Sequence, residues 1–351
     1  MTEIFAVIMA GGRGERFWPL STDSFPKPFL PLAGPATLIQ ETVSRLQPLI
    51  PPEQIFISVG AVQEEVARKQ LPQIAAENFV IEPVGRDTAA CLGFCALHLE
   101  KRAPECMMLA MPADHFIADP DDFRSCLQKG LDSLAGAIGV VFGIVPVRPD
   151  TGYGYILAEK PSAPSDAWPV LRFVEKPNAE TAAQYLEAGN YFWNSGMFLW
   201  KNQTLLDLFQ KHMPEMYRSL CQMRPLLGVE EAQAETIRIF STLQRISIDF
   251  GILEKTGGLR MIPLHSGWDD IGSWNSLERI FQPDPAGNVT RGSSTLIGSN
   301  GCITYSDSGI VTALGVKDLV IVQARGRVLV CPKSAASDLK ILVSSLDPEW
   351  K

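Results

Sequence analysis

Several features that would place the chain in a special class are missing from its sequence. No run approaches the roughly 18 consecutive apolar residues that a membrane helix needs, and the first residues lack the basic character of a signal peptide. The seven cysteines are scattered and form no C-x-x-C pair, which argues against a disulfide framework and a zinc site. These absences predict a cytoplasmic protein without a membrane anchor.

An excess of positive charge is also missing. The 351 residues carry 31 basic and 39 acidic side chains, a net charge of −8, and no long run of Lys or Arg. The composition therefore shows no basic cluster of the kind that binds nucleic acid. A polyanionic ligand would therefore need a local pocket of its own.

Three common catalytic signatures are absent as well. The sequence contains no G-x-S-x-G elbow, no Gly-Lys dipeptide of a P-loop, and no H-E-x-x-H among its four histidines. A serine hydrolase, a P-loop nucleotidase and a zinc protease therefore lack support.

The first half of the chain alternates short apolar runs with segments of helical periodicity. Such repeated strand-helix-strand units predict an α/β fold with a Rossmann-like, doubly wound, mixed but mainly parallel sheet, whose ligands bind at the carboxyl ends of the strands. The expected strands cover residues 4–9, 54–59, 79–81, 106–111 and 137–145, and the expected helices cover 37–49, 62–71, 88–102 and 121–134.

Beyond residue 152 the pattern loosens, and it changes again after the turn-forming segment 283–288. Closely spaced short strands then predict a small β domain closed by a helix over 335–343. We expect a catalytic domain over 1–285 and a small domain over 286–351. The expected strands of the later part are 171–174, 197–200, 259–264, 294–297, 302–305, 310–313, 319–322 and 328–330, and the helices are 179–188, 202–212, 230–243 and 273–281.

The loop after the first strand, from Ala10 to Leu20, is the most informative motif. Three glycines in four positions, Gly11, Gly12 and Gly14, let backbone N–H groups converge on phosphate oxygens. Basic side chains at Arg13, Arg16 and Lys27 add positive charge. A glycine turn with surface cations is the alternative, but its place after the first strand favours phosphate binding.

Two carboxylates are candidate metal ligands. Asp114 follows the strand that ends near Pro112, and Asp270 lies in the segment Gly267 to Trp274. Brought together from 156 positions apart, the pair would form a Mg²⁺ site completed by phosphate oxygens and water. The alternative for each is a helix cap or turn.

Three later segments offer further candidate groups. Polar side chains stand at Glu175 and Lys176, at a strand end, and at Asn194, in an expected glycine turn, and the Gly-Tyr-Gly-Tyr string with Gly154 offers a backbone that a ligand can approach closely. Such groups suit sugar hydroxyls, although each taken singly is more often a turn or a surface ion pair.

Taken together and in order, the motifs resemble those of sugar-1-phosphate nucleotidyltransferases, specifically the bacterial mannose-1-phosphate guanylyltransferases. The resemblance spans essentially the whole chain. It rests on the segments 10–21, 26–27, 82–89, 112–115, 152–155, 174–177, 193–198, 247–249 and 268–274. The chain departs from the family pattern at Asp87, where the family usually has Asn, and at Ala90, where it often has Pro.

The resemblance implies roles for particular residues. Catalysis falls to Arg16, Lys27, Asp114 and Asp270, the last two being Mg²⁺ ligands, and mannose 1-phosphate is contacted by Gly154, Glu175, Lys176 and Asn194. The implied nucleotide contacts are Ala10, Gly11, Gly12, Arg13, Gly14, Glu15, Arg16, Glu82, Arg86, Asp87, Thr88, Pro112 and Asp114.

The implied reaction is Mg²⁺-dependent transfer of GMP from GTP to mannose 1-phosphate. The tail resembles the short left-handed β-helix-like domain of the family, through which two copies could pair, and no isomerase domain is expected. Two alternatives stay open: a guanylyl- or adenylyltransferase for another sugar 1-phosphate, and a non-catalytic regulatory subunit. Retention of Arg13, Arg16, Lys27, Asp114 and Asp270 argues against the second.

Overall fold

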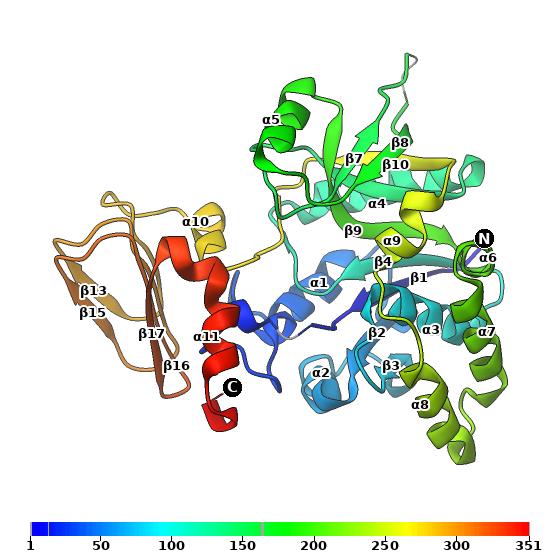
Figure 1. Cartoon of the computed structure of the whole chain (residues 1–351), viewed down its shortest axis with the longest axis horizontal. Helices are drawn as coiled ribbons and strands as arrows, with labels where there is room; N and C mark the ends of the chain where they lie inside the picture. Colours follow the sequence, from blue (N-terminus) through cyan, green and yellow to red (C-terminus); the bar gives the residue numbers. More distant parts are fainter. Residues whose placement is uncertain (1, 13, 163–164, 351) are drawn as a thin grey trace.

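The fold is built on one nine-stranded sheet, to which a separate stack of short strands is attached (Figure 1). The computed structural model describes residues 2–12, 14–162 and 165–350. The strand order in the large sheet is β3-β2-β1-β4-β9-β6-β10-β8-β7. No helix in the described part of the chain is long and apolar enough to cross a membrane.

The first four strands of this sheet run parallel and form one half of it. They are β1 (Ile4–Met9), β2 (Ile55–Gly60), β3 (Phe79–Glu82) and β4 (Met107–Pro112). Their side chains are almost entirely buried because helices cover both faces, as in other parallel sheets. The carboxyl ends of β1, β3 and β4 therefore deliver their following loops to one edge.

The second half of the sheet is mixed. Only β8 and β9 run against the other seven strands, which confirms the predicted fold class. The strands of this half are β6 (Gly139–Ile144), β7 (Tyr155–Ala158), β8 (Trp168–Val174), β9 (Tyr191–Lys201) and β10 (Leu259–Leu264), and the short β5 (Phe116–Ile117) pairs with β11 (Trp268–Asp269).

Strand β9 corrects one expectation. The segment around Asn194, predicted as a glycine turn, lies inside an 11-residue strand. Its pairing with β6 shifts register between Val141 and Gly143, and Gly196 has a φ of 69°. A β-bulge therefore accommodates the glycine and aims the side chain of Asn194.

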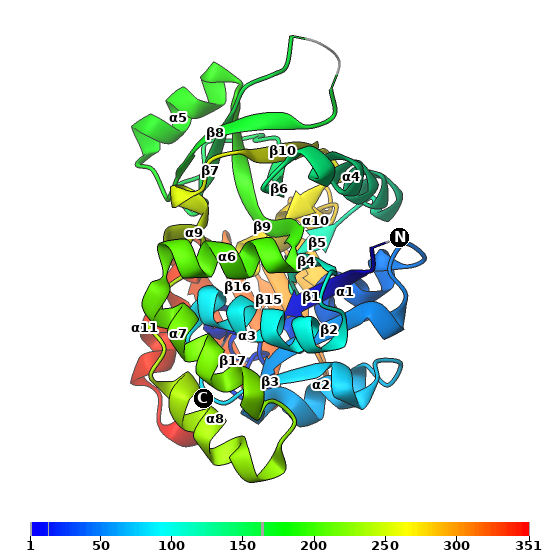
Figure 2. The ribbon, with the colours of Figure 1, turned by 90° about the vertical axis from the view of Figure 1, so that its right-hand side faces the viewer.

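Two sets of helices cover the sheet. Figure 2 shows α3, α6, α7 and α8 on the face toward the viewer, and the other face carries α1, α2 and α4. The helices are α1 (Leu38–Leu46), α2 (Glu64–Gln70), α3 (Asp87–Arg102), α4 (Pro120–Ser133), α5 (Ala179–Ala188), α6 (Asn202–His212), α7 (Pro214–Met223), α8 (Gln233–Ser241), α9 (Ile248–Gly251) and α10 (Leu277–Ile280).

The sequence also explains where several helices begin. Thr37 and Gln40 form a capping box before α1, and the side chain of Asp119 accepts two backbone N–H groups at the start of α4. Ser247 caps the short α9 in the same way. This last cap positions Asp249, which enters the site described below.

The C-terminal strands coil as a β-helix. Alternate strands stack in parallel, β12 on β14 on β16 and β13 on β15, and the antiparallel β17 closes the stack. The elements are β12 (Val289–Arg291), β13 (Ser294–Ile297), β14 (Ile303–Ser306), β15 (Val311–Leu314), β16 (Leu319–Ala324), β17 (Arg327–Pro332) and α11 (Leu339–Ser345).

This β-helix shares a core with the glycine-rich loop of the first half. Phe17, Trp18 and Trp274 pack in one buried cluster with Val320 and Leu339. In addition, Trp18 Nε1 donates to the carbonyl of Trp350 at 2.8 Å. The tail therefore supports the apolar side of the loop, although 332 positions separate the two tryptophans.

Candidate active site

The glycine-rich loop leaves open space at its tip and packs tightly at its base. Gly11 and Gly12 are exposed, and a Cβ added at either would meet no atom within 4 Å. Gly14 has a φ of 63°, and a Cβ there would lie 2.5 Å from the backbone nitrogen of Lys27. Close approach of the loop to Lys27 thus depends on this glycine.

The charged residues of this loop have distinct surroundings. Arg16 is exposed and donates to the carbonyl of Gly272 at 3.3 Å, whereas Glu15 lies 4.0 Å from Lys340 of α11. The backbone nitrogen of Ala10 donates to the carbonyl of Ser58, which continues the sheet past β1. Arg13 lies outside the described residues.

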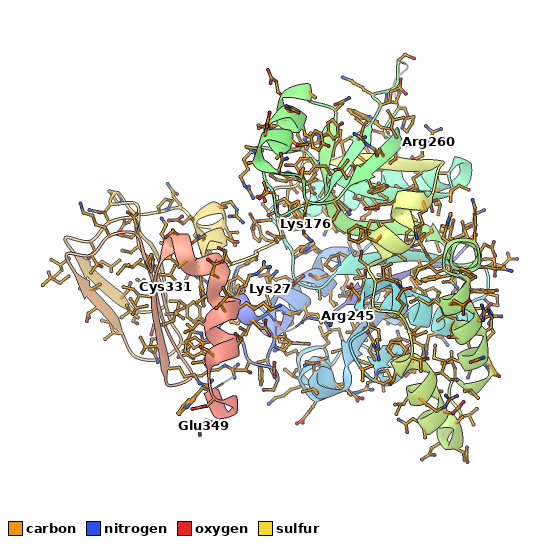
Figure 3. All side chains as sticks on the ribbon, in the orientation of Figure 1. Lys27, Lys176, Arg245, Arg260, Cys331 and Glu349 are labelled. Atoms are coloured by element: carbon orange, nitrogen blue, oxygen red, sulfur yellow. The ribbon has the colours of Figure 1, made fainter. Side chains whose placement is uncertain are left out.

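Lys27 contacts both residues of the predicted metal-binding pair, the side chain of Asp114 and the backbone of Asp270. Its ammonium pairs with Asp114 Oδ2 at 2.9 Å and donates to the backbone carbonyl of Asp270. The Lys27 side chain is only 11% exposed, so this contact is largely shielded from water. We call Lys27, Asp114 and Asp270 the carboxylate cluster; Figure 3 shows Lys27 near the middle of the molecule, below Lys176.

Asp114 is held ionised by its neighbours. Burial is the largest influence and acts to raise the pKa of its carboxyl, but the charge of Lys27, the hydrogen bond from Lys27 and further neighbours together hold the pKa below its usual range. The adjacent His115 accepts a hydrogen bond from Trp268 Nε1 at its Nδ1. Burial lowers the pKa of His115 to about 4, so its ring is neutral at pH 7.

Of the adjacent residues Asp269 and Asp270, it is Asp270 that belongs to the carboxylate cluster. Its neighbour Asp269 is buried and held by Arg279 Nη2 at 2.8 Å, so Asp269 has a structural role. The helical turn that follows is capped by Ser273, which excludes the cap alternative for Asp270. Asp270 Oδ1 instead accepts a hydrogen bond from the hydroxyl of Tyr153 at 2.6 Å.

The donor set of the cluster suits a hard cation. Asp114 and Asp270 are each 26% exposed in their side chains, and Mg²⁺ prefers such oxygen ligands. Within the described ranges, no three His, Cys, Asp or Glu side chains gather into a ready-made metal site. Two carboxylates fit a Mg²⁺ ion that keeps water and takes phosphate oxygens.

The segment from Glu82 to Thr88 is held mainly by its own side chains. Glu82 is buried and accepts from Ser58 Oγ at 2.8 Å, and burial raises the pKa of its carboxyl. Arg86 donates to the carbonyl of Ser241, and Thr88 Oγ1 accepts from the backbone of Ile248. These three side chains therefore face protein partners.

The open part of the same segment is small. Gly85 is exposed and has no neighbour that a Cβ would meet, and Asp87 is exposed at the start of α3. Asp87 has a φ of 68°, a conformation that Asp and Asn tolerate better than most residues. Pro112, at the end of β4, lies against Gly196 instead.

The four predicted sugar contacts meet in one place. A Cβ at Gly154 would lie 2.5 Å from Glu175 Oε2 and 3.5 Å from Asn194 Cβ, and the backbone of Asn194 donates to the carbonyl of Gly154 at 2.8 Å. Lys176 pairs with Glu175 at 2.9 Å. Because Gly154 follows Tyr153, this group adjoins the carboxylate cluster.

Asp249 was given no role by sequence reasoning. Its Oδ1 accepts from Asn194 Nδ2 at 2.6 Å, so it belongs to the sugar group. Burial raises the pKa of Asp249 to about 6, the hydrogen bond from Asn194 opposes this rise, and the charge of Glu175 adds to it. The capped Ser247-Ile248-Asp249 string was the available signal.

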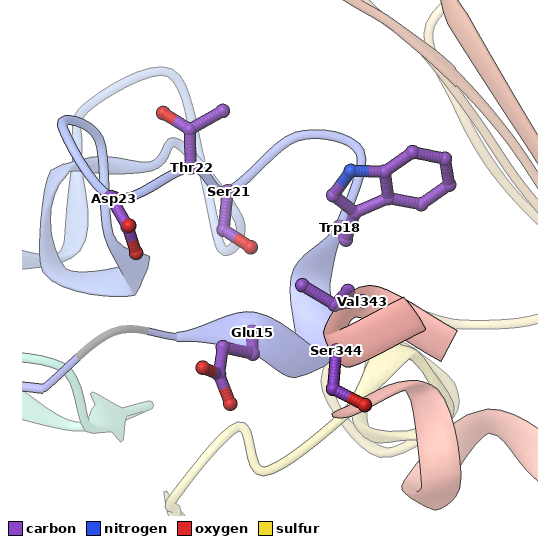
Figure 4. Close-up of a pocket in the computed structure, with 7 residues that line it drawn as sticks. All are labelled: Glu15, Trp18, Ser21, Thr22, Asp23, Val343 and Ser344. Carbon is purple, nitrogen blue, oxygen red and sulfur yellow. The ribbon is translucent and has the colours of Figure 1, made fainter. Parts of the chain in front are cut away.

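A small cavity lies on the outer side of the glycine-rich loop, against α11. Its volume is about 180 Å³, and neither Lys27 nor the two carboxylates line it (Figure 4). It marks where loop and tail meet and not where the charged groups converge. Its lining residues are Glu15, Trp18, Ser21, Thr22, Asp23, Val343 and Ser344.

Comparison with known proteins identifies this architecture. Residues 5–286 match the nucleotidyl transferase family, and residues 292–346 match the MannoseP isomerase/GMP-like beta-helix domain. A mannose-1-phosphate guanylyltransferase of Escherichia coli K12 is 36% identical over 100% of this chain and 75% of that protein. RfbM of Salmonella typhimurium, a mannose-1-phosphate guanylyltransferase, is 38% identical over 97% of this chain and 72% of that protein.

A solved structure agrees. A Thermus thermophilus protein described as a mannose-1-phosphate geranyltransferase is 37% identical, with a TM-score of 0.89 and coverage of 98% of this chain and 99% of that one. The match over most of the chain shows that it belongs to the nucleotidyl transferase family. Within that family it belongs to the mannose-1-phosphate guanylyltransferases.

Proposed function

We propose that the chain transfers GMP from GTP to α-D-mannose 1-phosphate with Mg²⁺ and releases pyrophosphate. The observation that carries the proposal is the contact of Lys27 with both Asp114 and Asp270 beside the group that contains Gly154 and Asn194. Charge for a triphosphate and polar groups for a sugar thereby adjoin one another. Membership in the mannose-1-phosphate guanylyltransferases supports this choice of substrates.

The reaction needs positioning and charge neutralisation more than covalent chemistry. A phosphate oxygen of the sugar phosphate attacks the α-phosphorus of GTP in line, the new P–O bond forms, and the bond to pyrophosphate breaks with its electron pair on the leaving oxygen. Lys27 and Arg16 stabilise the negative charge that gathers on pyrophosphate. Neither residue forms a covalent bond to the substrate.

Asp114 and Asp270 would hold Mg²⁺. When bound, the ion would neutralise charge on the phosphate oxygens and draw the two substrates together. The protein prepares this site through Lys27, which holds the backbone of Asp270 and keeps Asp114 ionised.

The glycine-rich loop binds the triphosphate in this proposal. The open backbone at Gly11 and Gly12 donates to phosphate oxygens, and Gly85 and Asp87 lie at the guanine. Glu82, Arg86 and Thr88 keep that second segment in place through their protein contacts. Ala10, Arg13, Gly14, Glu15 and Pro112 complete the proposed nucleotide site.

The sugar phosphate binds at the second group. Lys176 meets the phosphate, and Glu175, Asn194 and the backbone of Gly154 meet the hydroxyls. Asp249 orients the amide of Asn194 through their hydrogen bond. This adds Asp249 to the residues that fix sugar specificity.

A pyrophosphate-release assay tests the proposal. It crosses GTP, ATP, UTP and dTTP with the 1-phosphates of mannose, glucose and fucose in Mg²⁺, with Asp114→Asn as the control for contaminating activity. We expect release with GTP and mannose 1-phosphate far above every other pair. Release confined to another pair would assign another sugar nucleotide, and none with any pair would favour a non-catalytic subunit.

Three predictions from the sequence stay proposals. They are a cytoplasmic location, pairing of two copies through the tail, and a domain boundary between residues 285 and 286. Trp18 of the first proposed domain and Leu339 of the second lie in one shared core. We therefore propose that the two domains do not fold independently.

A further inference from the structure

We propose that Tyr153 is a positioning residue that fixes the carboxylate of Asp270 for metal binding. The inference rests on the proposed function of the carboxylate cluster. Its first observation is the 2.6 Å hydrogen bond from the Tyr153 hydroxyl to Asp270 Oδ1. The two residues are 117 positions apart, so the contact joins the loop before β7 to the loop after β11.

The direction of this hydrogen bond is set by a third residue. Arg148 Nη2 lies 3.3 Å from the Tyr153 hydroxyl, and both Nε and Nη2 of Arg148 are held by Asp150 Oδ2. A guanidinium only donates hydrogen bonds. The hydroxyl oxygen therefore accepts from Arg148, and its proton is directed to Asp270.

The ring of Tyr153 has little freedom to turn away. Its centroid lies 5.0 Å from that of Trp193 and 5.3 Å from that of Trp268, both in edge-to-face geometry. Trp268 in turn donates to His115, the neighbour of Asp114. The same aromatic group thus contacts the chain beside both carboxylates.

The consequence for Asp270 is a fixed carboxylate. Lys27 holds its backbone carbonyl, and Tyr153 holds Oδ1. In the described part of the chain, Oδ2 accepts no hydrogen bond. A ligand oxygen whose orientation is set by an outer hydrogen bond binds metal more tightly, and loss of such a partner typically costs about 10- to 100-fold in metal affinity.

The test compares two tyrosine hydroxyls. Tyr153→Phe keeps the ring between Trp193 and Trp268 and removes only the hydroxyl. Tyr191→Phe is the matched control, because its hydroxyl also meets an arginine, Arg172 at 3.2 Å, but no residue of the cluster. Binding of Mn²⁺ alone is titrated by the electron paramagnetic resonance signal of the free ion, and thermal unfolding checks each variant.

We expect Tyr153→Phe to weaken Mn²⁺ binding by about tenfold or more, and Tyr191→Phe to match the wild type. Equal affinity in the wild type and Tyr153→Phe, including no saturable binding in either, would overturn the inference. If Tyr153→Phe does not fold, Arg148→Met decides: weaker Mn²⁺ binding supports the inference, and wild-type affinity overturns it.

The same titration separates this inference from the proposed function. A wild type that binds Mn²⁺ through Tyr153 but releases no pyrophosphate with any substrate pair would refute the function and keep the inference. Pyrophosphate release with GTP and mannose 1-phosphate, together with unchanged Mn²⁺ affinity in Tyr153→Phe, would support the proposed function and refute the inference.

Discussion

The carboxylate cluster and the tip of the glycine-rich loop differ in how much the protein completes by itself. The side chain of Lys27 is 11% exposed and already paired, and Asp270 is held by groups from two other segments. Gly11 and Gly12 are exposed, with open space where a side chain would be. The charged centre is assembled in advance, whereas the loop leaves its backbone for the ligand to occupy.

This difference follows from physical cost. Charged groups must be fixed before reaction, because reorganising them during the chemical step would consume the stabilisation they provide. Backbone N–H groups at a glycine turn need only access, since they donate wherever a phosphate oxygen fits. Changes in the cluster should therefore affect turnover, and changes at the tip should affect nucleotide binding.

The largest effect is expected from neutralising a carboxylate. Asp270→Asn should lower kcat by roughly 10³-fold or more, because it removes charge at the reacting phosphates. The adjacent Asp269→Asn should instead lower the free energy of unfolding by about 2 kcal/mol, because Arg279 loses its buried partner. Steady-state kinetics and urea unfolding of both variants check this; equal kinetic losses would contradict the division of roles.

Removal of the bridging ammonium comes next. Lys27→Met should lower kcat by about 10²- to 10³-fold, as measured for other charged or dipolar groups at transition states. The exposed Lys69→Met serves as the control for loss of a positive charge. A rate within twofold of the wild type would remove Lys27 from the mechanism.

A pair of glycine substitutions sharpens the comparison within one loop. Gly11→Ala should leave stability unchanged but raise KM for GTP by roughly tenfold or more, because its methyl group enters the space proposed for phosphate. Gly14→Ala should lower stability by about 1–3 kcal/mol, because φ is 63° and the methyl group meets Lys27. Thermal unfolding and GTP kinetics of both variants give the answer; the reverse pattern would show that the tip is filled by protein.

The smallest effect concerns the pH dependence of stability. The pKa of Asp249 is raised to about 6 in the folded state. The protonated carboxyl therefore stabilises the fold fully below the ordinary pKa near 3.8, and this stabilisation is lost as the pH rises through about 6. Asp249→Asn lacks this loss. The Tm of the variant minus the Tm of the wild type should therefore be larger at pH 8 than at pH 4 by about 2 °C or more. A Tm difference that is the same at both pH values would refute this.

The sequence predicted the parts of the molecule that follow local patterns. The parallel strands, the loop after β1 and the convergence of Asp114 with Asp270 all come from strand order and from motifs at strand ends. The long strand β9 was missed in part, because a bulge at Gly196 has the composition of a turn.

Contacts between distant segments escaped prediction for a different reason. Neither Tyr153 nor Asp249 lies in a pattern that reveals its partner, and the Trp18 contact with Trp350 spans 332 positions. Glu82 was assigned to the nucleotide by its motif, and in the structure its buried carboxylate accepts a hydrogen bond from Ser58. Motifs locate a segment, whereas packing decides which of its side chains remain open.

The central claim is that the two carboxylates act as one preassembled unit, and a double-mutant cycle in single-turnover GMP transfer tests it most directly. Groups that act together are strongly non-additive. Asp114→Asn combined with Asp270→Asn should therefore be no slower than the slower single variant. A double variant whose loss equals the product of the two single losses would show independent roles and contradict the account.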